Sequence, residues 1–230
     1  GGTYSISKDE LPTFYKLYCD HIFVKGQKEY LTEKQIDNGP LLVDLDFRYT
    51  YDVDTRQHTP EHIYDIISLY LEELKEFFIF KDGVQFPIFV MEKPNVNRVV
   101  DKQETKDGIH MIVGIQMDHT AQMILRDKII KQIGDIWDLP LTNNWDKVLD
   151  EGISQGSVNW QMYGSQKPGY EAYKLTYYLT AELDVNDNNW MTTAKALKEI
   201  DLLKDLHLLS AQYDSHLKFD INPKIKENEK

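Results

Sequence analysis

Residues 41–47 read LLVDLDF, and this segment constrains the fold more than any other stretch of the chain. Apolar side chains occupy its alternate positions, at Leu41, Val43, Leu45 and Phe47. Because successive side chains of a β-strand point to opposite faces, this spacing predicts a strand whose rear face is covered by a hydrophobic core. Asp44 and Asp46 then share the front face, with their carboxylates about 6–7 Å apart along the strand. The chain must therefore contain a sheet that is packed on one side and carries two acids on the other.

Helices and further strands are predicted on both sides of this segment. Apolar residues at spacings of three and four predict helices over 8–23, from Pro60 to Phe78, and over 119–137, with Thr59 as an N-cap before Pro60. Strands are predicted at 86–92 (FPIFVME), at 108–115 (GIHMIVGI) and within 170–183. The order lacks the regular alternation of a doubly wound sheet, so the expected class is α+β or mixed α/β.

The chain is expected to divide into an N-terminal helical segment (1–39), a core (40–183) and a C-terminal helical segment with a tail (184–230). The polar stretch DVNDNNWMTT at 184–193 is expected to separate the core from a C-terminal helix. The apolar positions of that helix would be Leu197, Ile200, Leu203 and Leu206. The sequence begins with Gly-Gly instead of Met and ends in the polar run KIKENEK, which indicates a piece of a longer protein.

Composition limits the classes of protein and of partner. The sequence is 41% apolar, enough for a substantial core. Cys19 is the single cysteine, which excludes an internal disulfide and a cysteine-based zinc site and indicates a reducing, intracellular setting. No stretch is long and apolar enough to span a membrane, so no membrane partner is expected. The net charge of −12 argues against a broad basic surface for nucleic acid but is compatible with a local basic groove.

The two acids on one strand have two interpretations. Carboxylates this close repel each other and raise each other's pKa unless a cation compensates, and carboxylate oxygens suit Mg²⁺ or Mn²⁺. Alternatively, Asp44 and Asp46 face solvent on an edge strand and a neighbour such as Arg48 balances their charge. A D-x-D pattern by itself does not distinguish a metal site from such a surface.

A histidine on a second predicted strand favours the metal site. Within 108–115 the apolar residues share one face, at Ile109, Met111, Val113 and Ile115. His110 projects from the opposite face and has Lys102 and Lys106 as basic neighbours. If the two strands pair, His110 would stand beside the acids, where it could hold a phosphate or ligate a metal. The alternative is a structural histidine at a strand edge.

A third segment, LDEGISQGSVNWQMYGSQK at 149–167, offers further polar groups. Asp150 and Glu151 each provide a candidate third carboxylate. Ser165 and Lys167 within YGSQK suit a loop that wraps a polyphosphate. Taken alone, however, the segment favours an ordinary turn, and the Walker A pattern is absent. Three carboxylates, a histidine and this loop together describe a two-metal site for phosphoryl transfer, in which positioning and charge supply most of the rate.

The order of these motifs resembles the archaeo-eukaryotic primase superfamily, in particular the N-terminal primase domains of primase-helicase proteins in nucleocytoplasmic large DNA viruses. The matching segments are LLVDLDF, GIH and LDEGISQGSVNWQMYGSQK, between about residues 40 and 180. The resemblance implies an α+β primase fold, in which two α+β units, one of them RRM-like, lie around an active-site cleft. It also implies a helicase domain in the same full-length polypeptide, and the host cytoplasm or virus factory as the location if the protein is viral.

Carried over residue by residue, the resemblance assigns roles to the candidate residues. Asp44, Asp46 and Asp150 would be the catalytic ligands of Mg²⁺ or Mn²⁺. The nucleotide-binding residues would be His110, Ser165 and Lys167, assisted by Arg48 or Lys106. The implied activity is the joining of ribonucleoside or deoxynucleoside triphosphates on a single-stranded DNA template, as in a DNA primase or primase-polymerase. Aromatic residues that could stack on bases are Trp160, Tyr163 and Tyr170.

Two other functions stay open. A D-x-D glycosyltransferase using Mn²⁺ and a nucleotide sugar would explain the acids, but it leaves the GIH and YGSQK segments without a task. A non-catalytic module with the primase fold, which binds template or partner subunits, would be expected to have lost its acids. Those acids are intact in this sequence.

Overall fold

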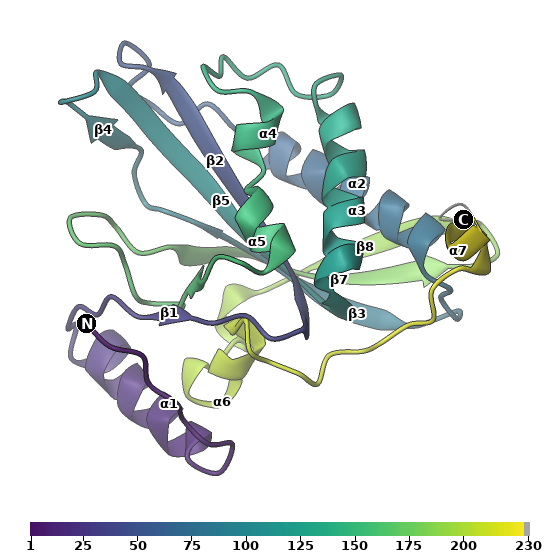
Figure 1. The fold of residues 1–230 in the computed structure, drawn as a ribbon, viewed down its shortest axis with the longest axis horizontal. Coiled ribbons are helices and arrows are strands. Elements are labelled where there is room, and N and C mark those ends of the chain that lie inside the picture. Colours follow the sequence, from purple (N-terminus) through teal and green to yellow (C-terminus); the bar gives the residue numbers. More distant parts are fainter. Residues whose placement is uncertain (228–230) are drawn as a thin grey trace.

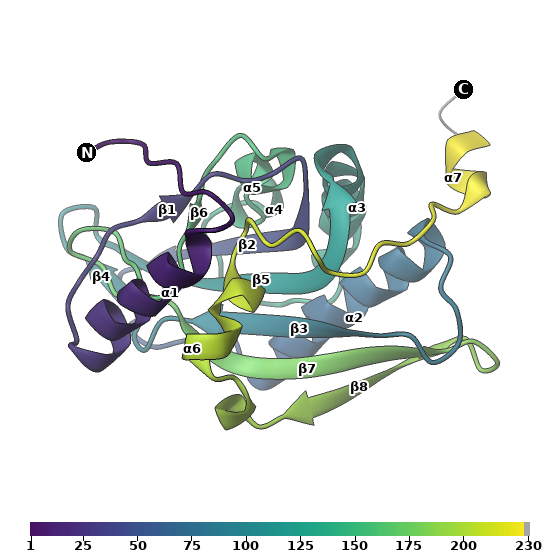
Figure 2. The ribbon, with the colours of Figure 1, turned by 90° about the horizontal axis from the view of Figure 1, so that it is seen from below.

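A computed structural model describes residues 1–227 of the chain, so residues 228–230, the end of the predicted tail, lie outside the described residues. The centre is a six-stranded antiparallel sheet in the order β2-β5-β3-β7-β8, with β4 paired to β5. Its strands are β2 (Asn38–Thr50), β3 (Gln85–Glu92), β4 (Asn97–Val99), β5 (Glu104–Asp118), β7 (Lys174–Asp184) and β8 (Asn189–Lys195). Figure 2 shows β2, β5, β3, β7 and β8 stacked in that order. The expected α+β class is confirmed.

The two predicted strands with polar front faces pair with each other as β2 and β5. From residue 43 to residue 49 the odd-numbered side chains of β2 are buried, whereas Asp44 is half-buried and Asp46 is exposed. This alternation follows from the pleat of the strand. The register places Asp44 opposite His110 and Asp46 opposite Gly108. The histidine therefore stands beside the acids.

Two helices cover the rear face of the main sheet. α2 (Pro60–Phe77) begins where the sequence predicts, with Thr59 as N-cap in a capping box. α3 (His119–Ile133) directly follows β5, and Asp118 Oδ1 accepts a hydrogen bond from Ala121 N at its start. α3 ends before Gly134, earlier than the expected end at 137. Apolar side chains of these helices and of the rear faces of β2, β3 and β5 form the largest core cluster.

Smaller elements cover the front face in part. They are a two-stranded sheet of β1 (Thr32–Glu33) and β6 (Trp160–Gln161), α1 (Leu11–Cys19) with a π-helical turn at Asp20–Val24, and α5 (Glu151–Gln155). α4 (Trp145–Val148) lies beside β2, and its Val148 belongs to the largest core cluster. In Figure 1, α1 and α6 (Leu202–Asp205) lie together, well away from α2 and α3. Trp160 and Ile153 pack on Leu42, Phe89 and Ile112 of the main sheet in a second cluster. This cluster fixes the small sheet to the main sheet.

The prediction that residues 184–193 separate two parts of the chain is wrong. They form the turn after β7 and most of β8, which pairs with β7 in the main sheet. The ring of Trp190 packs on Phe80 and Phe86, with centroid distances of 5.1 and 5.5 Å. This aromatic contact joins an otherwise polar stretch to the core.

The predicted single C-terminal helix is also wrong. The structure has a 3₁₀ turn at Leu197–Glu199, α6 at Leu202–Asp205 and a second 3₁₀ turn at Leu206–Leu209. Ile200 has an extended backbone, and Asp201 Oδ1 accepts a hydrogen bond from Leu203 N, so α6 starts anew at this point. Leu217 then pairs with Ile115, and α7 (Pro223–Glu227) follows. The boundary at 39 stays a prediction, whereas the one at 183 falls within β7 of the main sheet.

Within residues 1–227, no helix has both the length and the apolar character that crossing a membrane requires.

Glu33 on β1 is a buried acid that makes stability depend on pH. Its carboxylate accepts hydrogen bonds from the Ser210 hydroxyl and from Ala211 N, yet burial raises its pKa from 4.5 to about 7. The folded protein therefore binds this proton more tightly than the unfolded chain does. The resulting stabilisation is complete below pH 4.5 and is lost as the pH rises through about 7.

We expect Glu33→Gln, which keeps the shape of the protonated acid, to reduce this pH dependence. The melting temperature of the unsubstituted protein, followed by circular dichroism, should fall between about pH 5 and about pH 8, and that of Glu33→Gln should fall less. Glu199→Gln, at an exposed position, serves as the control and should follow the unsubstituted protein. Equal slopes for Glu33→Gln and the unsubstituted protein would show that Glu33 does not titrate in this range.

Candidate active site

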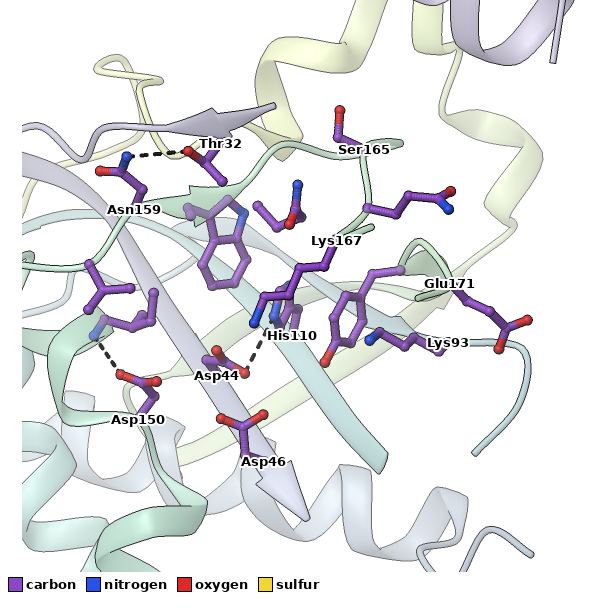
Figure 3. A pocket seen from close by; sticks show the side chains of 16 residues that line it. Thr32, Asp44, Asp46, Lys93, His110, Asp150, Asn159, Ser165, Lys167 and Glu171 are labelled. Atoms are coloured by element: carbon purple, nitrogen blue, oxygen red, sulfur yellow. Dashed lines mark hydrogen bonds and ion pairs between the residues drawn. The ribbon is translucent and has the colours of Figure 1, made fainter. Parts of the chain in front are cut away.

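A pocket lies between the main sheet and the small sheet. Its lining includes Asp44 and Asp46 from β2, His110 from β5, Thr32 from β1, Trp160 from β6 and Lys167 from the following loop. Figure 3 shows the side chains of Asp44, Asp46 and Lys167 directed into a common space beside His110. Residues that are far apart in the sequence thus form one site.

Three carboxylates converge in this pocket. One oxygen of each of Asp44, Asp46 and Asp150 lies within 4.8 Å of the corresponding oxygens of the other two. Asp44 and Asp150 are half-buried, and Asp46 is exposed. Within residues 1–227, no other group of three histidine, cysteine or acidic side chains converges this closely.

The third carboxylate is held by its own local structure. Asp150 N donates a hydrogen bond to Asp44 O at 3.0 Å, and Asp150 Oδ1 caps α5 by accepting one from Ile153 N at 3.0 Å. Glu151, the other candidate, is exposed, and its carboxylate accepts a hydrogen bond from Gln155 on the same helix. The acid that joins Asp44 and Asp46 is therefore Asp150.

The acids carry more negative charge than the surrounding protein balances. Although part of the Asp46 side chain is exposed, the pocket around its carboxyl group excludes much of the water there. This desolvation, and next repulsion from Asp44 and Asp150, raise the pKa of Asp46 to about 7, while the charges of Lys167 and Arg48 oppose this rise. Asp44 Oδ1 is buried and accepts no hydrogen bond within the described part of the chain. A buried carboxylate oxygen without a hydrogen bond, in a group of three acids, fits a hard divalent cation, which takes oxygen ligands. The three acids therefore form a group that could hold a metal.

His110 is fixed beside the acids by two aromatic rings. It is 7% exposed, and its Nε2 lies 3.4 Å from Asp44 Oδ1. The imidazole stacks on Tyr173 with a centroid distance of 3.6 Å and packs on Trp160 at 4.3 Å. A Cβ at position 108 would lie 2.5 Å from Tyr173 Oη and 2.9 Å from Leu45 O, so this position requires glycine. The glycine of the GIH segment thus makes room for the tyrosine that orients the histidine.

The whole arrangement agrees with a comparison of the sequence with protein families. Residues 1–179 match the family described as the C962R protein N-terminal AEP domain, where AEP denotes the archaeo-eukaryotic primase superfamily. The chain belongs to this family. The match extends over most of the chain and confirms the resemblance inferred from the three motifs.

A viral protein is also similar to this AEP domain. Over 192 residues the chain is 29% identical to a protein of Acanthamoeba polyphaga mimivirus named "Putative helicase L207/L206". The alignment covers 81% of the chain but 20% of that protein. The AEP domain thus spans about a fifth of the length of this relative.

The YGSQK loop of the AEP domain contributes an exposed ammonium group and a hydroxyl group that is already hydrogen-bonded. Lys167 is exposed, and its ammonium group reaches toward Asp44 and His110 (Figure 3). Ser165 lines the pocket but is 1% exposed, and its hydroxyl lies 2.7 Å from Tyr18 Oη, with which it forms a hydrogen bond. Contact of either residue with a nucleotide stays a prediction.

Arg48 and Lys106 lie outside the pocket lining of the AEP domain. They face each other across β2 and β5, further along the front face that carries the acids. Arg48 Nη1 is 3.9 Å from Glu104 Oε1. The two cations therefore extend the polar face beyond the pocket, and their predicted help in nucleotide binding is untested.

Sequence reasoning missed Lys93 as a site residue. This lysine follows β3, lines the pocket, and its ammonium lies 5.3 and 5.0 Å from the ring centroids of Tyr170 and Tyr173. Burial and then the charge of Lys167 lower its pKa. Its carbonyl oxygen accepts a hydrogen bond of 2.7 Å from Arg56, whose guanidinium also pairs with Asp107. A lysine directly after the predicted strand 86–92 was the available signal, but the polar residues that follow it predict a solvated loop.

The aromatic residues have different surroundings. Trp160 is 1% exposed and packs on His110, so it has no open face for a base, which contradicts its suggested stacking role. Tyr163 Oη accepts a hydrogen bond from Leu175 N. Tyr170 is 39% exposed and lines a second pocket, which shares Lys93 with the first. It is the most accessible of the three predicted stacking residues.

Proposed function

We propose that this AEP domain is a template-directed nucleotidyltransferase, the catalytic domain of a DNA primase or primase-polymerase. The observation that carries the proposal is the convergence of Asp44, Asp46 and Asp150 within 4.8 Å beside His110, opposite the ammonium groups of two lysines. A site with acids on one side and cations on the other suits a nucleoside triphosphate with its divalent cations. Membership of the AEP family supports the same activity.

Asp44, Asp46 and Asp150 would hold Mg²⁺ or Mn²⁺. When bound, these cations supply neutralisation of phosphate charge and activation of the attacking hydroxyl group. The carboxylates contribute by keeping their oxygens together before the substrate arrives, since β2 fixes two of them and the α5 cap fixes the third. Such preorganisation lowers the reorganisation that the reaction itself requires.

The triphosphate would lie between the acids and the lysines. Lys167 and Lys93 would bind its oxygens as point charges, and His110 would donate a hydrogen bond from an imidazole that Trp160 and Tyr173 hold in place. Ser165, whose hydroxyl is bonded to Tyr18, would contribute as part of the YGSQK loop that lines the triphosphate pocket. Arg48 and Lys106 would bind phosphates further along the front face, where a single-stranded DNA template could pass and Tyr170 could stack on a base.

A helicase domain in the same full-length polypeptide is the proposed partner. Its support is the name of the mimivirus relative, a putative helicase of which the chain matches about a fifth. A priming activity linked to a helicase would act on the single strand that the helicase exposes. A role in DNA replication is proposed on the same ground, because a primase linked to a helicase acts where the DNA strands are separated.

The proposal is tested by primer synthesis on circular single-stranded DNA. The protein is incubated with Mg²⁺ or Mn²⁺ and with either ribonucleoside or deoxynucleoside triphosphates, and labelled products are resolved on a denaturing gel. We expect products that require both template and divalent cation. Turnover of UDP-sugars without nucleotide incorporation would favour the glycosyltransferase instead. Absence of both activities and of metal-dependent nucleotide binding would leave the non-catalytic module.

Lys93→Met and Lys167→Met are each expected to weaken binding of a nucleoside triphosphate by about tenfold, because each removes a charge-assisted hydrogen bond to phosphate. Dissociation constants are measured by calorimetry in the presence of Mg²⁺. Lys102→Met, in the exposed turn between β4 and β5, is the matched control and should bind like the unsubstituted protein. Unchanged affinity in both pocket variants would exclude the lysines from the binding site.

A further inference from the structure

The outer edge of β2, on the side away from β5, is bonded to a loop and not to another strand. Residues 142–150, which include the short helix α4 and are here called the edge loop, run along this edge. Four hydrogen bonds join them: Thr142 N to Arg48 O (2.9 Å), Arg48 N to Asn143 Oδ1 (3.2 Å), Asn143 Nδ2 to Asp46 O (2.9 Å) and Asp150 N to Asp44 O (3.0 Å). The backbone of both acids of β2 is thus held by the loop that carries the third acid.

A buried arginine lies beneath the edge loop. Arg126, on α3, is 2% exposed. Its Nε and Nη2 both donate to Leu149 O, at 3.0 and 2.7 Å, and Nη2 also donates to Asp146 O at 2.8 Å. The acids within its reach, Asp127 and Asp146, are themselves exposed, at 59% and 61% of the side chain. The principal buried partners of this guanidinium are therefore backbone carbonyl groups of the edge loop.

Burying the Arg126 guanidinium is unfavourable, because removing a charge from water costs free energy. Ion pairs with exposed acids such as Asp127 and Asp146 offset little of this cost, so the burial indicates another role. A residue that only filled space in α3 would be apolar, like Leu125 and Ile129 on the same helix, both of which are 0% exposed. The planar fork of an arginine can hold two carbonyl oxygens in one geometry, which neither an apolar residue nor a lysine can do. The structure therefore uses Arg126 to define where the edge loop lies.

We propose that Arg126 is a positioning residue for the cation site. It fixes Leu149, and the next residue, Asp150, then donates its amide to Asp44 O and places its carboxylate beside Asp44 and Asp46. Arg126 does not line the pocket, so it acts through the loop and not through the substrate. The inference rests on the proposed function, because it assumes that the three acids bind a divalent cation.

The test compares the affinity for Mn²⁺ of four folded proteins by calorimetry, in the absence of nucleotide and DNA. The proteins are the unsubstituted chain, Arg126→Met, Arg126→Lys and Ile129→Ala. Arg126→Met should bind Mn²⁺ about tenfold more weakly, because residues that support metal ligands have effects of this size. Arg126→Lys should show a smaller loss. Ile129→Ala, which removes packing from the same helix without touching the loop carbonyls, should melt at lower temperature but bind Mn²⁺ normally.

A local measurement separates positioning from general destabilisation. Amide hydrogen exchange at Asp150 should accelerate in the Arg126 variants, because its bond to Asp44 O loosens, and should stay unchanged in Ile129→Ala. Normal Mn²⁺ affinity in folded Arg126→Met would overturn the inference. If Arg126→Met does not fold, normal Mn²⁺ affinity in Arg126→Lys would overturn it. Failure of the unsubstituted protein to bind Mn²⁺ would instead refute the cation site, and with it both this inference and the proposed function.

Discussion

Asp44→Asn and Asp46→Asn are each expected to lower nucleotide incorporation by about a hundredfold to a thousandfold, the loss typical of removing one preorganised charged group from an active site. Asparagine keeps the size of the side chain but removes the charge that a divalent cation requires. The measurement is the rate of nucleotide incorporation on single-stranded DNA at saturating nucleotide and Mn²⁺. Asp187→Asn, in the exposed turn between β7 and β8, is the matched control and should be fully active.

The same two variants should not be less stable than the unsubstituted protein when metal is absent. The pKa of Asp46 is raised by burial and by the charges of Asp44 and Asp150, so neutralising one acid relieves repulsion in the folded state. Loss of activity without a fall in melting temperature is the pattern of a site under functional constraint. Incorporation at the unsubstituted rate by both variants would refute the metal-site assignment, and a large fall in melting temperature would indicate a structural role.

Asp150→Asn should lower the rate of nucleotide incorporation by a similar factor, whereas Glu151→Gln should be close to fully active. The two acids are adjacent in sequence, but Asp150 lies within 4.8 Å of the other carboxylates and Glu151 is exposed on α5. Asparagine at 150 can still accept the hydrogen bond from Ile153 N that caps α5, so the helix should remain. The comparison therefore isolates the charge of the third ligand from its role as a cap.

The measurement for this pair is nucleotide incorporation together with Mn²⁺ affinity by calorimetry. Asp150→Asn should lose both, and Glu151→Gln should lose neither. The reverse result would make Glu151 the third ligand and would require α5 to turn relative to the present structure. Equal activity in both variants would mean that two acids suffice for the site.

Local patterns predicted the elements that are regular over many residues. The strand at 41–47, the helix that begins at Pro60 and the strand at 108–115 appear as β2, α2 and β5, because each has a long and consistent apolar period. Predictions failed where packing overrides a weak period. β8 is polar apart from Trp190, Met191 and Ala194, and the contact of Trp190 with Phe80 and Phe86 joins its side chains to the core.

The supporting residues of the site were the hardest to predict. Lys93 and Arg126 lie outside the three motif segments and Tyr173 lies six residues after YGSQK, and each contacts neighbours that are distant in the sequence. From the sequence alone, an arginine at position 126 within the helix 119–137 is predicted to face solvent. Its burial depends on the edge loop that covers it, which the spacing of residues in α3 does not encode.

The sequence by itself determined which side chains share a face. Asp44 and Asp46 alternate with apolar residues, and His110 does the same on its own strand, because the period of two is a property of the extended backbone. Only the tertiary structure decided that Asp44 lies opposite His110, that Asp150 and not Glu151 completes the acidic group, and that Arg126 holds it there. The physical reason is that register and loop position arise from packing and hydrogen bonds between distant segments, whereas periodicity is set within each segment.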